Sequence, residues 1–294
     1  LKCFTDLASQ NYLQQAAQHY QAALKKACYE LKGSGGECEL LAYEGLGHVY
    51  QHRGDYLNAI ALYQFALAVV QDKTKQAQFK NLDSLASQDR LVQAIKRVEQ
   101  QFLISATGKT NLQPKEYALD QAHQKQLKAI RAAARAQLRK RDALLQREPH
   151  QGPENTSQLS YTQKLDQTLA QEDLTVQQIY QKINAELRGF VRELIEECKE
   201  VLGPPPCGHA VICFGSLARD EATPYSDLEF GVLLAEGADS ETNKAYFRRL
   251  TQLLNIKVLN LGETTPRMQD ISELREIGLC SRYSTPPNKP GFSF

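Results

Sequence analysis

The chain has 294 residues, of which 42% are hydrophobic and 23% charged, and its formal net charge at pH 7 is +1. This length predicts two domains, each large enough to bury a core of its own. The near-zero charge excludes a protein that binds polyanions through its overall charge, and the lack of a run of about 18 apolar residues excludes a membrane-spanning helix.

The start of the chain and its cysteines indicate the compartment. Residues 1–6 lack the apolar core of a signal peptide, and the sequence has no initiator Met, so we expect a processed or partial chain. The 7 cysteines are irregularly spaced and form no zinc-ligand set with histidines. Cys28 and Cys38 flank a glycine-rich loop and could meet, but free thiols in a reducing cytosol are the prediction. We therefore expect a cytoplasmic protein.

Small and aromatic residues recur at helical spacing in the N-terminal part. Gly54 is expected to end one helix and Asp55 to cap the next. The first helix would present Tyr43, Leu46, Gly47 and Tyr50, and the second Ala59, Tyr63 and Ala66. A partial earlier copy of the second set is formed by Ala16, Tyr20, Ala23 and Leu24.

This pattern resembles the tetratricopeptide repeat (TPR) family. The resemblance implies an all-α region of helical repeats over residues 1–104, with an amphipathic helix over 84–104 continuing the stack. Such repeats imply a protein partner bound on a concave surface, although the partner cannot be named. The alternative is that two helical hairpins simply pack on the rest of the chain.

Residues 105–160 are predicted to form a basic helix and a linker. A long helix is expected over 121–147, and residues 148–160, with two prolines and a glycine, are expected to be a flexible linker. The basic face could bind RNA or an acidic partner, but no aromatic residues interleave with its charges, so a solvated face is favoured over RNA binding. Its members are Lys125, Lys128, Arg131, Arg135, Arg139, Lys140 and Arg141.

A further amphipathic helix leads into the most informative part of the chain. It is expected to start at Asp173 or Thr175 and to end at Gly203, before three prolines. An apolar strand then runs from His209 and ends in Gly215-Ser216.

Two carboxylates open the next predicted strand, which follows a turn at Pro224. Asp227 and Glu229 are two residues apart, so their side chains should lie on the same face of the strand. Adjacent carboxylates repel each other unless a cation lies between them, and Mg²⁺ suits such a pair together with substrate phosphates. The Gly215-Ser216 turn would offer backbone N–H groups and a hydroxyl to those phosphates.

These residues resemble the nucleotidyltransferase superfamily, and more closely the PII-protein uridylyltransferases. The positions that carry the resemblance are Gly215, Ser216, Ala218, Arg219, Glu221, Pro224, Ser226, Asp227 and Glu229. The resemblance implies that residues 161–294 form an α/β domain of the polymerase-beta-like type with a mixed sheet. The whole chain is therefore expected to be of mixed fold class, all-α first and α/β afterwards.

The resemblance also implies roles for the site residues. Asp227 and Glu229 would bind Mg²⁺, with two ions expected and Mn²⁺ as the alternative metal. Gly215, Ser216, Arg219 and Ser226 would bind the nucleotide, although Arg219 could instead pair with Glu221 or Asp220. A third carboxylate is expected as ligand and base. Glu263, after a strand-like run at residues 256–261, is the candidate, ahead of Asp270 or a residue beyond Phe294.

The predicted reaction is transfer of a nucleoside monophosphate from an NTP to a hydroxyl group, with release of pyrophosphate. UTP and ATP are the favoured donors, CTP stays open, and the acceptor would be a protein, or a small molecule as in antibiotic adenylyltransferases. The alternative is a TPR scaffold for protein interactions that carries an inactive nucleotidyltransferase fold.

Overall fold

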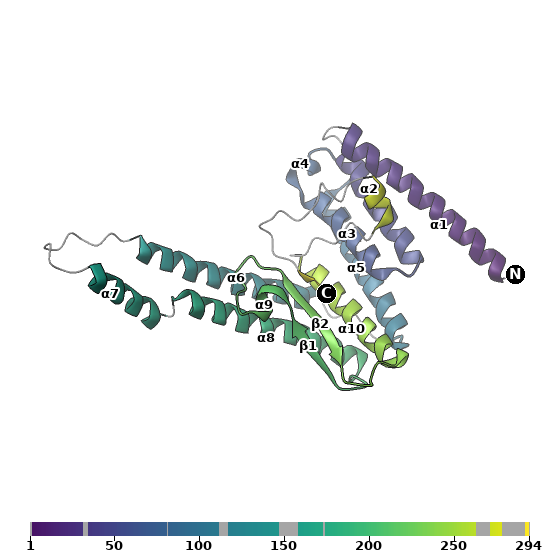
Figure 1. The fold of residues 1–294 in the computed structure, drawn as a ribbon. Helices are drawn as coiled ribbons and strands as arrows, with labels where there is room; N and C mark the ends of the chain where they lie inside the picture. Colours follow the sequence, from purple (N-terminus) through teal and green to yellow (C-terminus); the bar gives the residue numbers. More distant parts are fainter. Residues whose placement is uncertain are drawn as a thin grey trace. The chain divides into compact units, whose positions relative to one another are not determined.

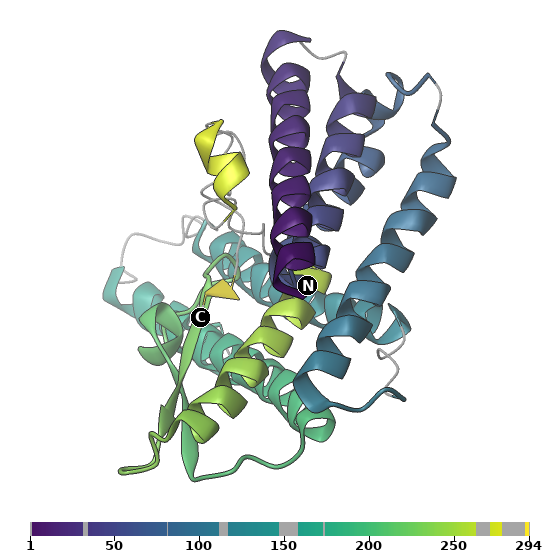
Figure 2. The same ribbon diagram turned by 90° about the vertical axis from the view of Figure 1, so that its right-hand side faces the viewer.

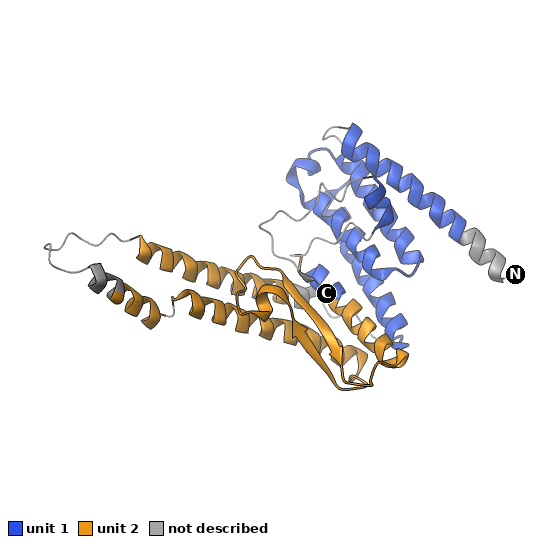
Figure 3. Ribbon diagram, in the orientation of Figure 1, with its two compact units in different colours: residues 1–116, 255–260, 265–286 blue, residues 117–254, 261–264, 287–294 orange. Residues whose placement is uncertain are grey.

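A computed structural model describes residues 2–31, 35–80, 82–111, 117–146, 158–172, 174–262, 271–277 and 292–293 (Figure 1). The chain divides into two compact units, coloured separately in Figure 3. Unit 1 contains residues 1–116, 255–260 and 265–286, and unit 2 contains residues 117–254, 261–264 and 287–294.

Unit 1 is built from helices. In this unit α2 packs against both α1 and α3, and α3 packs against α5; Figures 1 and 2 both show these helices side by side. Its elements are α1 (Lys2–Lys25), a π-helical turn η1 (Lys26–Glu30), α2 (Gly36–His52), α3 (Tyr56–Gln71), α4 (Lys73–Gln76), α5 (Ser84–Thr107) and α11 (Ser272–Glu276).

The turn between α2 and α3 forms as predicted. Gly54 has a φ of +76°, a left-handed conformation that glycine adopts without strain. The Asp55 carboxylate then caps α3, accepting hydrogen bonds from the Asn58 backbone N–H at 3.3 Å and its side-chain amide at 2.9 Å. The amphipathic helix expected over 84–104 is confirmed as α5. Cys28 and Cys38 are not joined by a disulfide bond.

Two glycines let aromatic rings pack directly on α2. A Cβ added to Gly47 would lie 2.8 Å from Cε1 of Tyr63 on α3, and one added to Gly45 would overlap the ring of Tyr20 on α1. Glycines two residues apart face different sides of a helix, so α2 receives one ring from each neighbour. The structure shows that Tyr63 packs against Gly47, whereas the assignment of these hairpins to the TPR family stays a prediction.

Unit 2 combines long helices with a small mixed sheet. Strand β1 pairs antiparallel with β2, with Cys213 opposite Phe230, and β2 pairs parallel with β3. Its elements are α6 (Tyr117–Leu145), α7 (Gln158–Gln171), α8 (Val176–Leu202), β1 (His209–Cys213), α9 (Gly215–Ala218), β2 (Leu228–Leu234), β3 (Phe292–Ser293) and the first part of α10 (Glu241–Asn260).

The helix that precedes β1 begins at the second of the two predicted positions. Thr175 is the N-cap of α8, and its hydroxyl accepts from the Gln178 N–H while the Gln178 side chain accepts from the Thr175 N–H. Gly203 ends the helix, as predicted. None of the described helices has the combination of length and apolarity that crossing a membrane requires.

Two expectations for secondary structure are wrong. The strand expected over residues 256–261 is instead the end of α10 and a turn, because Leu250, Leu253 and Leu254 extend the apolar run backward at helical spacing and all are buried. A buried helix is as apolar as a strand in so short a window. The linker expected over 148–160 falls mostly outside the described residues, but residues 158–160 begin α7, which the sequence analysis missed.

Candidate nucleotide site

The turn after β1 brings Gly215 against Glu229. Gly215 has a φ of +58°, and a Cβ built there would lie 2.5 Å from Oε2 of Glu229. The Phe214 N–H donates to the Glu229 carbonyl at 2.8 Å, so backbone and side chain of Glu229 both adjoin this turn. Glu229 follows Gly215 by 14 positions in the sequence, yet its side chain lies next to the Gly215-Ser216 turn.

The start of β2 separates apolar from acidic side chains. Leu228 and Phe230 are buried, at 0% and 4% exposure, whereas Asp227 is exposed and Glu229 is half-buried. Because side chains alternate along a strand, the Glu229 carboxylate lies on the face opposite Leu228 and Phe230. Asp227 directly precedes the strand, so the shared face of the two carboxylates stays a prediction.

The surroundings of Glu229 suit a cation. Among the described residues, no side chain makes a hydrogen bond or ion pair with its carboxylate, although this side chain is partly removed from water. Mg²⁺ is usually held by one or two carboxylates together with phosphates and water, so the Asp227–Glu229 pair fits this ion. The described ranges contain no group of three potential metal-ligating side chains. Glu263 and Asp270 lie outside those ranges.

Arg131 of α6 supports the turn that precedes Asp227. Its side chain is 2% exposed, and its Nη1 donates to the carbonyl oxygens of Pro224 at 3.0 Å and Ser226 at 3.2 Å. A buried guanidinium is tolerated only when it is hydrogen-bonded, so these contacts fix both the arginine and the turn. Arg131 is thus a structural part of the site.

The solvated basic face predicted from the sequence included Arg131, and this prediction is wrong for that residue. The expectation holds for Lys125, Lys128 and Arg139, which are exposed. The signal that could have separated Arg131 from them is its helical spacing, four residues after Leu127 and three before Ala134, both of which are buried.

Ser226 braces the same turn. Its hydroxyl accepts from the Thr223 N–H at 2.9 Å and lies 3.1 Å from the Thr223 hydroxyl, and the Ser226 N–H donates to the Thr223 carbonyl at 3.1 Å. The turn predicted at Pro224 is therefore present. The guanidinium of Arg135 lies over the exposed ring of Tyr225, 5.9 Å from its centre. In this arrangement Ser226 shapes the approach to Asp227.

Arg219 pairs with Glu221, one of the two acidic partners that the sequence left open. Its Nε donates to Oε2 of Glu221 at 2.8 Å, and the two side chains are 62% and 55% exposed. An exposed pair of this kind contributes little free energy, so Arg219 can leave it for a phosphate. Next to it, Arg188 of α8 donates to the Leu217 carbonyl at 2.7 Å and pairs with Asp220 at 2.6 Å. Arg188 was not singled out from the sequence, and no local pattern marks it.

An apolar cavity of about 550 Å³ lies on the other face of the sheet. Val211, Phe230 and Val232 line it together with Phe247 and Leu250 of α10. Since Phe230 and Glu229 point to opposite faces, this cavity is separate from the carboxylates.

Comparison with known proteins gives one match. Residues 160–266 match the family described as "Putative nucleotidyltransferase DUF294". The matched segment contains the Gly215-Ser216 turn, Asp227 and Glu229, and it supports a nucleotidyltransferase-type domain in this part of the chain. No curated protein and no solved structure matches the chain.

Proposed function

We propose that unit 2 transfers a nucleoside monophosphate from an NTP to a hydroxyl group. The observation that carries the proposal is the contact of the half-buried Glu229 carboxylate with the Gly215 turn, two residues after Asp227. The match of residues 160–266 to a nucleotidyltransferase family supports the same reaction class.

Each site residue has a role in this reaction. Asp227 and Glu229 would hold Mg²⁺, or Mn²⁺ in its place, and such an ion would supply charge neutralisation at the triphosphate and polarisation of the attacking hydroxyl. The missing Cβ of Gly215 lets the Glu229 carboxylate lie against the turn that would bind the phosphate chain. Arg219 moves from Glu221 to a phosphate oxygen, which its guanidinium fork fits. Arg131 and Ser226 keep the turn before Asp227 in place.

The bonds exchanged define the chemistry. The acceptor oxygen bonds to the α-phosphorus while the bond from that phosphorus to the bridging oxygen breaks, and pyrophosphate leaves in line. The hydroxyl proton passes to a base, for which Glu263 is the candidate carboxylate. We favour UTP or ATP as donor and a protein as acceptor, as in PII uridylyltransferases, with unit 1 binding the protein partner.

The test uses the full chain with Mg²⁺, a cell lysate as acceptor source and each of the four α-³²P-labelled NTPs in turn. We expect label from one NTP in a protein band, and we expect Asp227→Ala and Glu229→Gln to lower incorporation at least 100-fold. Asp239→Ala, which removes an exposed carboxylate outside the site, should not change it. A folded wild-type chain that transfers label from none of the four would overturn the proposal.

The alternative is a scaffold that carries an inactive transferase fold. Such a protein would bind NTP weakly or not at all in the presence of Mg²⁺ and would release no pyrophosphate. Equilibrium binding of each NTP, measured beside pyrophosphate release, separates the two functions.

A further inference from the structure

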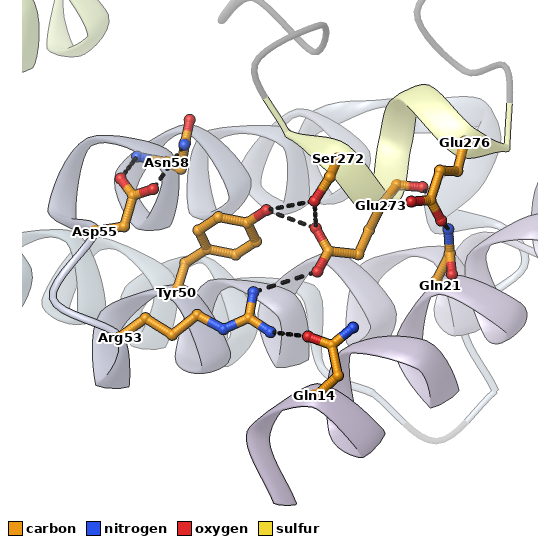
Figure 4. Close-up of polar contacts among 9 residues, drawn as sticks. All are labelled: Gln14, Gln21, Tyr50, Arg53, Asp55, Asn58, Ser272, Glu273 and Glu276. Atoms are coloured by element: carbon orange, nitrogen blue, oxygen red, sulfur yellow. Dashed lines mark hydrogen bonds and ion pairs between the residues drawn. The ribbon is translucent and has the colours of Figure 1, made fainter. Parts of the chain in front are cut away.

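A short segment near the end of unit 1 is deeply packed against its first helices. Helix α11 has five residues, yet Leu274 and the adjoining Ile271 are fully buried and Glu273 is nearly so. A helix this short does not form stably by itself in water, so its conformation depends on the surface that it contacts. That surface is provided by α1 and α2 (Figure 4).

Both oxygens of the Glu273 carboxylate are held by α2. The Tyr50 hydroxyl donates to Oε2 at 2.5 Å, and Arg53 Nη1 lies 3.3 Å from Oε1. The second arm of Arg53 donates to Gln14 Oε1 of α1 at 2.9 Å, which holds the guanidinium in place. Figure 4 shows Tyr50 and Arg53 reaching the Glu273 carboxylate, with Gln14 in contact with Arg53.

Gln21 of α1 contacts the segment at two further points. Its side-chain amide donates to the Glu273 backbone carbonyl at 3.1 Å and to Glu276 Oε2 at 2.8 Å. The surface therefore recognises one buried carboxylate, a second exposed carboxylate and a main-chain carbonyl, while Ile271 and Leu274 supply the apolar anchors. Contacts of these kinds are how helical surfaces bind short amphipathic peptides.

Charge is retained at the centre of this contact. Burial alone would raise the pKa of Glu273, but hydrogen bonds, the strongest of them from Tyr50, outweigh burial and bring this pKa below its ordinary value. Burial and the hydrogen bond to Glu273 raise the pKa of Tyr50 to about 12, so Tyr50 remains a donor. The surface thus selects an ionised carboxylate at this position.

We propose that Gln14, Gln21, Tyr50 and Arg53 form a binding site for an acidic, amphipathic helix of a partner protein, and that residues 271–277 occupy it in cis. A partner segment that competes for the site needs two apolar and two acidic residues. Their order is an apolar residue, an acid two positions later, an apolar residue directly after that acid, and a second acid two positions further on. The side chain of Arg53 keeps 28% exposure, so an incoming carboxylate can reach it before the cis segment has left. This proposal is independent of nucleotidyl transfer.

The test uses the full chain and a fluorescein-labelled, end-capped peptide with the sequence of residues 271–277, followed by anisotropy. In the Glu273→Gln chain the cis segment loses its ionic contact, so the peptide should bind about tenfold tighter than to the wild type, where it competes with the cis segment. Adding Arg53→Ala should abolish this binding. Adding Arg97→Ala, the loss of an exposed arginine of α5, should not change it. A peptide with Gln in place of both Glu residues should not bind.

Equal peptide affinity for the wild-type and Glu273→Gln chains, or unchanged binding after Arg53→Ala, would overturn the proposal. Hydrogen exchange of the wild-type chain gives a second readout that needs no variant. A millimolar excess of the peptide should increase deuterium uptake in residues 271–277, whereas unchanged uptake would show that the segment is permanent architecture.

Discussion

The two units differ in the partners of particular acidic side chains. In unit 1 three buried carboxylates have cationic partners: Glu39 pairs with Lys75 at 2.7 Å, Glu44 with Arg90 at 2.8 Å, and Glu273 with Arg53 at 3.3 Å. In unit 2, Nη1 of buried Arg131 donates to the carbonyl oxygens of Pro224 and Ser226, and the half-buried Glu229 has no cationic partner among the described residues.

This difference distinguishes charged side chains that stabilise the fold from a carboxylate that is available to a ligand. A carboxylate removed from water destabilises the fold unless it is paired, so unit 1 shows the arrangement that favours stability. Departures from that arrangement are expected at functional sites. In unit 2 the arginines shape the backbone around residues 217–226 and leave Glu229 available to a ligand.

The sharpest test of this comparison is Arg131→Met, set against Arg139→Met on the same helix. The first substitution deprives two carbonyls of their donor, and we expect it to lower the free energy of unfolding by about 2–4 kcal/mol. Transfer should fall about 100-fold, because displacing the turn displaces Asp227. Urea unfolding and the NTP-labelling assay measure the two effects.

Arg139 is exposed, so its replacement should leave both quantities nearly unchanged. If Arg131→Met retained full transfer, the turn would hold its shape without the arginine, and the proposed contrast between the units would fail.

In unit 1 we expect side-chain packing to contribute more to the free energy of unfolding than charge pairs do. Gly47→Ala forces a methyl group against the fully buried Tyr63 ring and should lower the free energy of unfolding by about 1–3 kcal/mol. Gly189→Ala in α8 is the matched control, since a Cβ there meets nothing within 4 Å. It should stabilise by about 0.5–1 kcal/mol, the usual gain of alanine over glycine in a helix. Thermal unfolding of both variants tests the opposite signs.

Gly215→Ala probes the contact with Glu229. Alanine at a positive φ costs about 1–2 kcal/mol, and Gly237→Ala, with a φ of +72° and open space around it, should show that strain alone. Only Gly215→Ala also displaces the Glu229 carboxylate, so it alone should weaken binding of Mg²⁺ and NTP. Titration of both variants with Mn²⁺ and nucleotide measures this; equal affinities would remove Gly215 from the site.

Prediction from the sequence was most accurate for features that depend on neighbouring residues in the chain. The Gly54 turn, the Asp55 cap and the start of α8 at Thr175 each depend on residues within one helical turn, and all are present. The site motif was found because its spacing resembles a known family, and the predicted face shared by both acids stays a prediction because Asp227 precedes β2.

Long-range contacts could not be predicted in the same way. Arg131 reaches carbonyls more than 90 positions away, and one basic residue among several gives no signal of that contact. The segment at 271–277 is short and lacks periodicity, and its partners lie on the first two helices. Residues 256–260 were mistaken for a strand because a buried helix and a buried strand have the same composition over so few residues.

The smallest expected effect concerns pH, and it belongs to unit 1. The pKa of Glu273 is lower in the folded chain than its ordinary value, so ionised Glu273 stabilises the folded state at neutral pH, and this contribution is lost as pH falls through the folded-state pKa. The charged group facing it is Arg53, while Tyr50, whose pKa is raised to about 12, does not titrate in this range. Deuterium uptake of residues 271–277 should therefore rise from about pH 5 downward, and Glu273→Gln should remove that dependence. Glu196→Gln, an exposed carboxylate of α8, should leave it intact. A pH response that survives in Glu273→Gln would assign it to another carboxylate and show that the buried pair in unit 1 is held by packing alone.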